Sequence, residues 1–89
     1  MELTNTVTPA MIDDIVRRCK WKTMTVFDKC TVVSCQLPNG FVIVESSACA
    51  DPANYNEELG KIICKDRIIN KIWELEGYRL QTEIGQEKT

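Results

Sequence analysis

Two runs of mostly β-branched and apolar residues stand on either side of a short turn near the middle of the chain. The first run reads KCTVVSCQL, the second reads FVIV, and Pro38, Asn39 and Gly40 lie between them. Val, Ile and Thr favour extended strands, while Asn and Gly tolerate the positive φ angles of tight turns. The segment from Lys29 to Val44 is therefore predicted to be a β-hairpin. Its turn is either a two-residue type I′ turn or a type I turn with Gly40 as a bulge.

A helix is predicted on the N-terminal side of this hairpin. Thr8 is a good N-cap, Pro9 suits the first helical position, and Arg17 and Arg18 complement the helix dipole at the other end. Apolar side chains recur with helical spacing and form one stripe, at Met11, Ile12, Ile15, Val16 and Cys19. This stripe predicts that the helix packs against another part of the protein.

A longer helix is predicted after the hairpin. Asp51 and Pro52 repeat the cap-plus-proline pattern, and the helix is expected to run to about Glu76, with Gly77 as a stop or kink. Its apolar residues cover more than one narrow stripe, which indicates a second partner surface: Tyr55, Leu59, Ile62, Ile63, Ile69, Ile72, Trp73 and Leu75. Gly60 either marks a close approach of another backbone or is a tolerated helical glycine.

These elements predict an α+β fold with a short N-terminal helix, a β-hairpin and a long C-terminal helix. No repeat or linker divides the chain, so residues 1–89 are expected to form a single domain, with frayed tails at residues 1–7 and 81–89. A chain of 89 residues buries a small core, and self-association is a common source of additional stability. We therefore expect an oligomer-forming domain.

Composition argues against several classes of protein. The net charge of −2 argues against a DNA- or RNA-polymer binder, and no apolar run is long enough for a signal peptide or a membrane span, so we expect a cytoplasmic protein. The chain has no histidine and no recognised catalytic motif, which argues against an enzyme, a metal site or a cofactor. Five cysteines with irregular spacing fit small core residues better than a disulfide framework: Cys19, Cys30, Cys35, Cys49 and Cys64.

One segment combines aromatic and cationic side chains. Trp21 lies between two lysines after the first helix, in a predicted loop that also contains Phe27 and Lys29. Aromatic rings stack on bases and ammonium groups attract phosphates, so the segment suits a nucleotide. Alternatively, Trp21 covers the end of the core and the lysines are solvated. On the long helix, Arg67 and Lys71 share a face and are placed to receive an anion, or to pair with nearby acids.

Three segments in a fixed order resemble a known family. They are Asn39-Gly40-Phe41, then ESSACADPANYNEELGKII, then KIWELEGYRL, and together they span Thr31 to Leu80. This order resembles small tailed-phage proteins of the anti-CBASS cyclic-oligonucleotide sponge type. The resemblance implies a homohexamer in the cytoplasm of the infected bacterium. It also implies that second messengers such as 3′,3′-cGAMP are held uncleaved between subunits, so that the CBASS effectors of the host are not activated.

The resemblance also implies site residues. Its base-stacking aromatic falls on Trp21, with Phe27 as a rival, and its phosphate-binding lysine falls on Lys29. A second site, for cyclic trinucleotides, is implied at Thr31 and a residue of the long helix: Arg67, Lys71 or Asn70. A different hypothesis is that the protein is an interaction module that inhibits a host protein through its apolar helix face.

Overall fold

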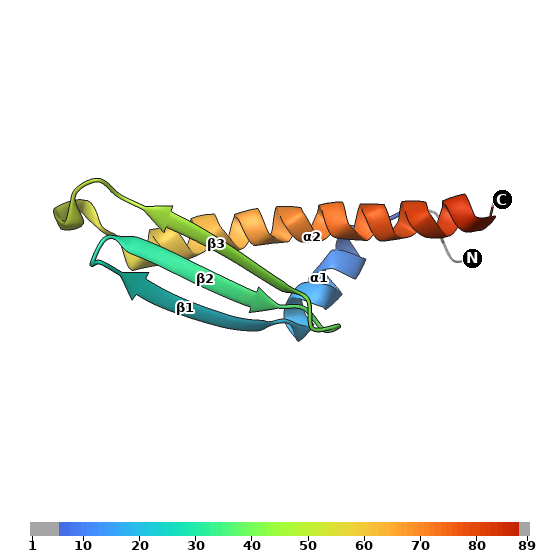
Figure 1. The fold of residues 1–89 in the computed structure, drawn as a ribbon, viewed down its shortest axis with the longest axis horizontal. Coiled ribbons are helices and arrows are strands. Elements are labelled where there is room, and N and C mark those ends of the chain that lie inside the picture. The colour runs from blue at the N-terminus through green and yellow to red at the C-terminus, as the bar shows by residue number, and fades with distance from the viewer. Residues whose placement is uncertain (1–5, 88–89) are drawn as a thin grey trace.

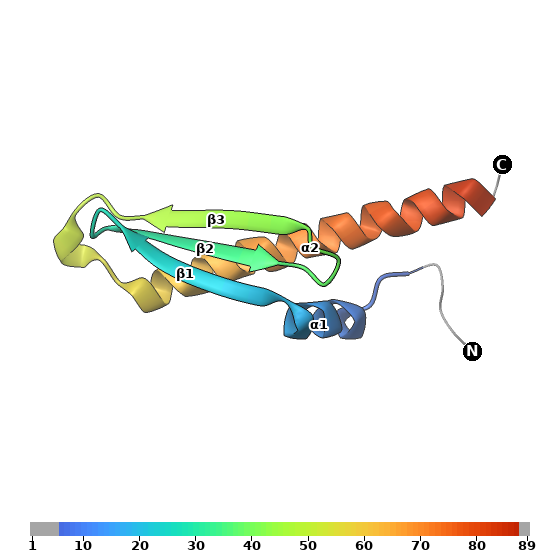
Figure 2. The same ribbon diagram turned by 60° about the horizontal axis from the view of Figure 1, so that its bottom comes forward.

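The computed structural model describes residues 6–87. In chain order, the elements are α1 (Pro9–Arg18), β1 (Lys20–Val26), β2 (Cys30–Gln36), β3 (Val42–Ala48), a short 3-10 helix η1 (Pro52–Asn54) and α2 (Glu57–Glu87). The strands form an antiparallel sheet in the order β1-β2-β3, and α2 crosses one face of the sheet and extends beyond it (Figure 1). Figure 2 shows α1 at the end of the sheet where β2 turns into β3. The predicted α+β class is confirmed.

The predicted N-terminal helix is confirmed as α1. The Thr8 hydroxyl accepts a hydrogen bond from the backbone N–H of Met11 at 3.3 Å, and Pro9 occupies the first turn. The helix ends at Arg18 because Cys19 is extended. Ile12 is buried in the core, so the apolar stripe does pack against the rest of the protein, as predicted.

Strand β1 is an element that the sequence did not predict. The segment expected to be a loop pairs with β2 along its whole length, with Trp21 opposite Cys35 and Thr25 opposite Thr31. Its side chains on the α2 side are Trp21, Thr23 and Thr25, so apolar and polar residues do not alternate. An edge strand of this kind lacks the periodicity by which strands are recognised in a sequence.

The predicted hairpin is confirmed as β2 and β3, and the structure decides its turn type. Leu37 and Phe41 close the turn, because the Gly40 N–H donates to the Leu37 carbonyl at 2.9 Å and the Leu37 N–H donates to the Phe41 carbonyl at 2.8 Å. Gly40 has a φ of 96°, whereas Asn39 is not among the residues with positive φ. This is the type I turn with a glycine bulge, one of the two predicted alternatives.

The turn between β1 and β2 has an unusual backbone. Phe27 and Asp28 have φ angles of 55° and 58°, and the Lys29 N–H donates to the Val26 carbonyl at 3.3 Å. The left-handed conformation costs a residue with a side chain about 1–2 kcal/mol, and glycine or asparagine usually occupies such positions. The Phe27 side chain gains no compensating burial within the chain, because it is 86% exposed.

Helix α2 begins later than predicted. Asp51 and Pro52 open only η1, and Tyr55 is extended because its hydroxyl is held on the sheet by Thr31, at 2.7 Å. The side chain of Asn56 then accepts from the Leu59 N–H at 3.0 Å and caps α2.

Helix α2 also ends later than predicted. It passes through Gly77 and continues to Glu87, so the residues expected to form a frayed tail from Gln81 are helical up to that point. Arg79 forms ion pairs with Glu76 and Glu83, at 3.1 and 2.6 Å, which bridge the turns on both sides of Arg79. The remaining tail residues, 1–5 and 88–89, lie outside the described residues, and Val7 packs against the core.

The core lies between the sheet and α2. It consists of Ile12, Val33, Cys35, Ile43, Cys64, Ile68 and Ile72. Gly60 is buried at one end of this core, and a Cβ added to it would lie 2.8 Å from the Cβ of Thr31. Gly60 therefore marks a close approach, but its close neighbour is the side chain of Thr31, so the predicted approach of another backbone is not confirmed.

The face of the sheet that points away from α2 is open within the chain. By the alternation of strand side chains, it carries Lys20, Lys22 and Met24 from β1 and Val42 and Val44 from β3. Met24, Val42 and Val44 are each more than half exposed.

Candidate functional site

The structure separates Trp21 from the two lysines that flank it in the sequence. Successive side chains of a strand point to opposite faces, so Lys20 and Lys22 lie on the open face and Trp21 lies on the α2 face. Half-buried against the core, Trp21 has a different cation above its ring: Nζ of Lys65 from α2 lies 5.3 Å from the ring centroid. Sequence reasoning missed Lys65, because only the packing of α2 on the sheet brings it to β1.

Lys29 and Phe27 lie at the other end of β1 from Trp21. Trp21 is the second residue of β1, and the strand ends at Val26 before the turn that contains Phe27 and Lys29. Five strand residues span about 17 Å, at roughly 3.4 Å per residue. The turn is held to the end of β3 because the carbonyl of Lys29 accepts from the Cys49 N–H at 3.0 Å. One chain therefore does not bring Trp21 and Lys29 together, and a small ligand that contacts both has to lie between two chains.

Thr31 is fully buried, and its hydroxyl is already engaged. Thr31 Oγ1 lies 2.7 Å from the Tyr55 hydroxyl, which is also 2.9 Å from Thr25 Oγ1. Thr25 in turn donates to a carboxylate oxygen of Glu57 at 3.1 Å. Thr31 lines a hollow of about 170 Å³ together with Tyr55 and Gly60, but Arg67 and Lys71 are not part of its lining. A ligand that bound the Thr31 hydroxyl would have to displace Tyr55.

Arg67 and Lys71 both reach from α2 to β3. Arg67 Nη1 donates to the carbonyl of Ser46 at 2.7 Å, and Lys71 Nζ lies 2.5 Å from a carboxylate oxygen of Glu45. They lie on the same side of the helix, as the sequence predicted, but their partners on β3 were not predicted. The structure does not place Thr31 and Arg67 around one hollow within a chain.

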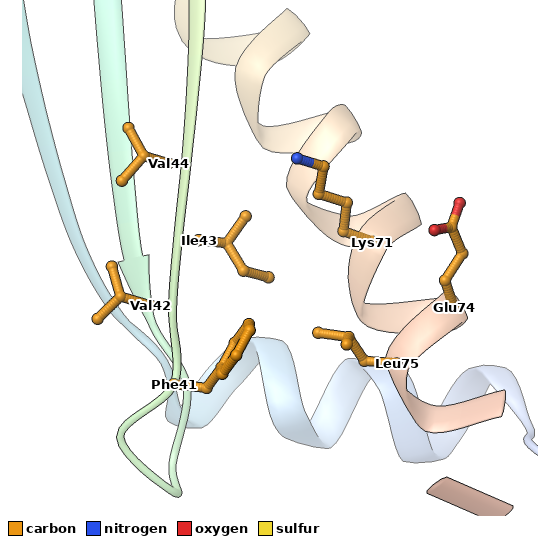
Figure 3. A pocket seen from close by; sticks show the side chains of 7 residues that line it. All are labelled: Phe41, Val42, Ile43, Val44, Lys71, Glu74 and Leu75. Atoms are coloured by element: carbon orange, nitrogen blue, oxygen red, sulfur yellow. The ribbon is translucent and has the colours of Figure 1, made fainter. Parts of the chain in front are cut away.

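A second hollow, of about 320 Å³, lies between β3 and α2 (Figure 3). Phe41, Ile43 and Leu75 point into this space, whereas Val42 and Val44 point away from α2. Lys71 extends along its rim towards β3, and Glu74 completes the lining. Phe41 and Leu75 are 53% and 37% exposed, so the hollow is an apolar space open to solvent with charged groups at its border.

The chemistry of the buried thiols is that of neutral core residues. Burial and the neighbouring thiol of Cys19 raise the pKa of Cys35 to about 12, and burial raises the pKa of Cys64. Between residues 6 and 87, no cluster of three or more Cys, Asp or Glu side chains is arranged to hold a metal ion. Neither helix in this part of the chain has an apolar stretch long enough to cross a membrane.

One protein-family model matches most of the chain. The model described as the Phage protein (N4 Gp49/phage Sf6 gene 66) family matches residues 7–84, from the residue before the cap of α1 to the last turns of α2. No curated protein and no solved structure matches the chain. Because the match covers both helices and all three strands, the chain belongs to the N4 Gp49/phage Sf6 gene 66 family of phage proteins.

Proposed function

We propose that this phage protein is a sponge for cyclic dinucleotides. In the cytoplasm of the infected bacterium, it binds messengers such as 3′,3′-cGAMP and keeps them from activating CBASS effectors. Membership of a phage protein family supports a role during infection of a bacterium. The resemblance of residues 31–80 to anti-CBASS sponges supports a cyclic dinucleotide as the ligand. The observation that carries the proposal is that Trp21 lies near the start of the edge strand β1 and Lys29 lies in the turn after its other end.

This position suits the symmetry of the ligand. A 3′,3′-cyclic dinucleotide has two bases and two phosphates that are related by an approximate two-fold axis. Two antiparallel copies of the chain, also related by a two-fold axis, place Trp21 of each chain near Lys29 of the other. Each half of the ligand then has one ring to stack on and one ammonium for its phosphate.

Lys65 adds a second cation to the stacking position. Its ammonium lies over the ring of a half-buried tryptophan, so a base that stacks on this face takes the place of the ammonium, which moves aside towards the phosphodiester. A stacked base contributes about 1–3 kcal/mol, and an ammonium close to the phosphodiester adds charge attraction. A homohexamer, which the resemblance implies, would contain several copies of this two-chain site.

A sponge returns its ligand unchanged. We therefore expect that 3′,3′-cGAMP incubated with the protein, isolated with it by gel filtration and released by heat is recovered as the intact cyclic molecule. Mass spectrometry of the released nucleotide gives the answer. The matched control is the same nucleotide incubated with Trp21→Ala, which should elute free of protein. Recovery of linear dinucleotide above the level in the protein-free sample would identify an enzyme.

A second candidate function rests on the exposed apolar residues of α2. Leu59 and Ile62, three residues apart on α2, are 55% and 57% exposed and form an apolar pair on the helix surface. They suit a module that inhibits a host protein through this helix, and such a module needs no nucleotide. Failure of 3′,3′-cGAMP to bind, together with loss of phage protection in a Leu59→Ser, Ile62→Ser variant, would favour this function.

A further inference from the structure

The β1–β2 turn presents Phe27 in a way that the packing of the chain does not explain. Phe27 and Asp28 are both in the left-handed region, with φ angles of 55° and 58°, where glycine or asparagine would close the turn without strain. The phenyl ring is 86% exposed. Strained residues persist where a function requires them, and an exposed aromatic ring at the tip of a hairpin is suited to insertion into another surface. We call Phe27 and Asp28 the knob.

The hollow between β3 and α2 offers a matching surface. Phe41 and Leu75 form its walls, and Ile43, which is buried, forms its floor (Figure 3). A volume of about 320 Å³ and an apolar lining suit one aromatic side chain. Lys71 at the border of the hollow is already paired with Glu45, and Glu74 also lines the hollow, so the match is one of apolar surfaces and not of charge.

The chain cannot fill its own hollow. The knob follows β1 at one end of the sheet, whereas Phe41 precedes β3 at the opposite end (Figure 1). Strand β2 has 7 residues and separates the two ends, a distance of about 20 Å for six steps at roughly 3.4 Å per residue. A second copy of the chain brings an aromatic ring to the apolar walls of the hollow.

We propose that the Phe27 ring of one copy inserts into the hollow between β3 and α2 of a second copy. Because the knob and the hollow are different surfaces, the contact is heterologous and repeats from copy to copy until a ring closes. The contact needs no nucleotide, so it stands or falls separately from the proposed function. It also brings Lys29, two residues after Phe27, to a place where chains meet.

Two variants test the contact from its two sides. Phe27→Gly removes the ring and keeps the left-handed turn, and Leu75→Glu places a charge in the hollow at an exposed helix position that tolerates glutamate. By sedimentation velocity, we expect each variant to have a lower assembly mass than the wild type. The control is Met24→Thr, which removes an apolar side chain that is 58% exposed from β1 outside the knob and should keep the wild-type mass. Far-UV circular dichroism establishes that each variant is folded.

Mixing the two variants gives the sharpest result. Phe27→Gly chains keep an intact hollow and Leu75→Glu chains keep an intact knob, so an equimolar mixture regains one contact between unlike chains. Native mass spectrometry should then show assemblies of higher mass in the mixture than in either variant alone. A monomeric wild type, a wild-type mass in either variant, or a mixture with no higher mass than the separate variants would overturn the proposal.

Discussion

Trp21→Ala is expected to cause the largest loss of ligand binding of any single substitution in the chain. Stacking on an aromatic ring contributes about 1–3 kcal/mol per base, and a two-fold site contains the substitution twice. The affinity for 3′,3′-cGAMP should therefore fall by about 2–6 kcal/mol, which is at least ~30-fold. Isothermal titration calorimetry at one fixed salt concentration measures the change.

The second tryptophan provides the matched control. Trp73 lies on α2 and is 37% exposed, so Trp73→Ala removes the same side chain from a position outside the proposed site. We expect this variant to bind 3′,3′-cGAMP like the wild type. Unchanged affinity in Trp21→Ala would show that the base stacks elsewhere.

Among substitutions that add a single methyl group, Gly60→Ala is expected to cause the largest loss of stability. The new Cβ would lie 2.8 Å from the Cβ of Thr31 and even closer to its hydroxyl oxygen, so Thr31 has to move and its hydrogen bond to Tyr55 is strained. Overpacking of a core costs about 1–3 kcal/mol, and disturbing a buried hydroxyl adds to this cost. For a domain of this size, each kcal/mol corresponds to about 4–8 °C in Tm. Thermal unfolding followed by circular dichroism measures the shift.

The control is the same substitution at Gly77, further along α2. A Cβ at Gly77 meets nothing within 4 Å, and Gly77 is helical, so Gly77→Ala should stabilise the protein by about 0.5–1 kcal/mol. The two glycine substitutions should thus shift Tm in opposite directions. A stabilising Gly60→Ala would contradict the close packing of α2 against Thr31.

The elements that could be predicted from the sequence are those with local determinants. Thr8 and Pro9 start α1 through hydrogen bonding and fixed φ within a single turn, and Gly40 closes the hairpin through its own backbone freedom. Strand β1 has no such determinant, because it is stabilised by its pairing with β2 and by the burial of Trp21. The start of α2 was misplaced because Tyr55, whose hydroxyl binds a residue of a distant strand, interrupts the helix after η1.

The site could be predicted only in part, for the same reason. Trp21 and Lys29 belong to one segment of the sequence, which was predicted to be a loop. The segment instead contains an extended strand, which holds the two residues apart. Because side chains alternate along the strand, Lys20 and Lys22 lie on the face opposite to Trp21. The cation that does lie over the Trp21 ring is Lys65, from a helix more than forty residues later in the sequence. Residue types that suit a nucleotide can be recognised in a sequence, but their distances depend on tertiary packing.

The central claim is that a cyclic dinucleotide binds intact between two chains, and calorimetric titration of the wild-type protein with 3′,3′-cGAMP tests it most directly. We expect saturable binding with one ligand for every two chains. Affinity should weaken in Lys29→Ala, by a factor that shrinks as salt is raised, because salt screens the contact of the wild-type ammonium with phosphate. The absence of binding, or saturation at one ligand per chain, would contradict the claim.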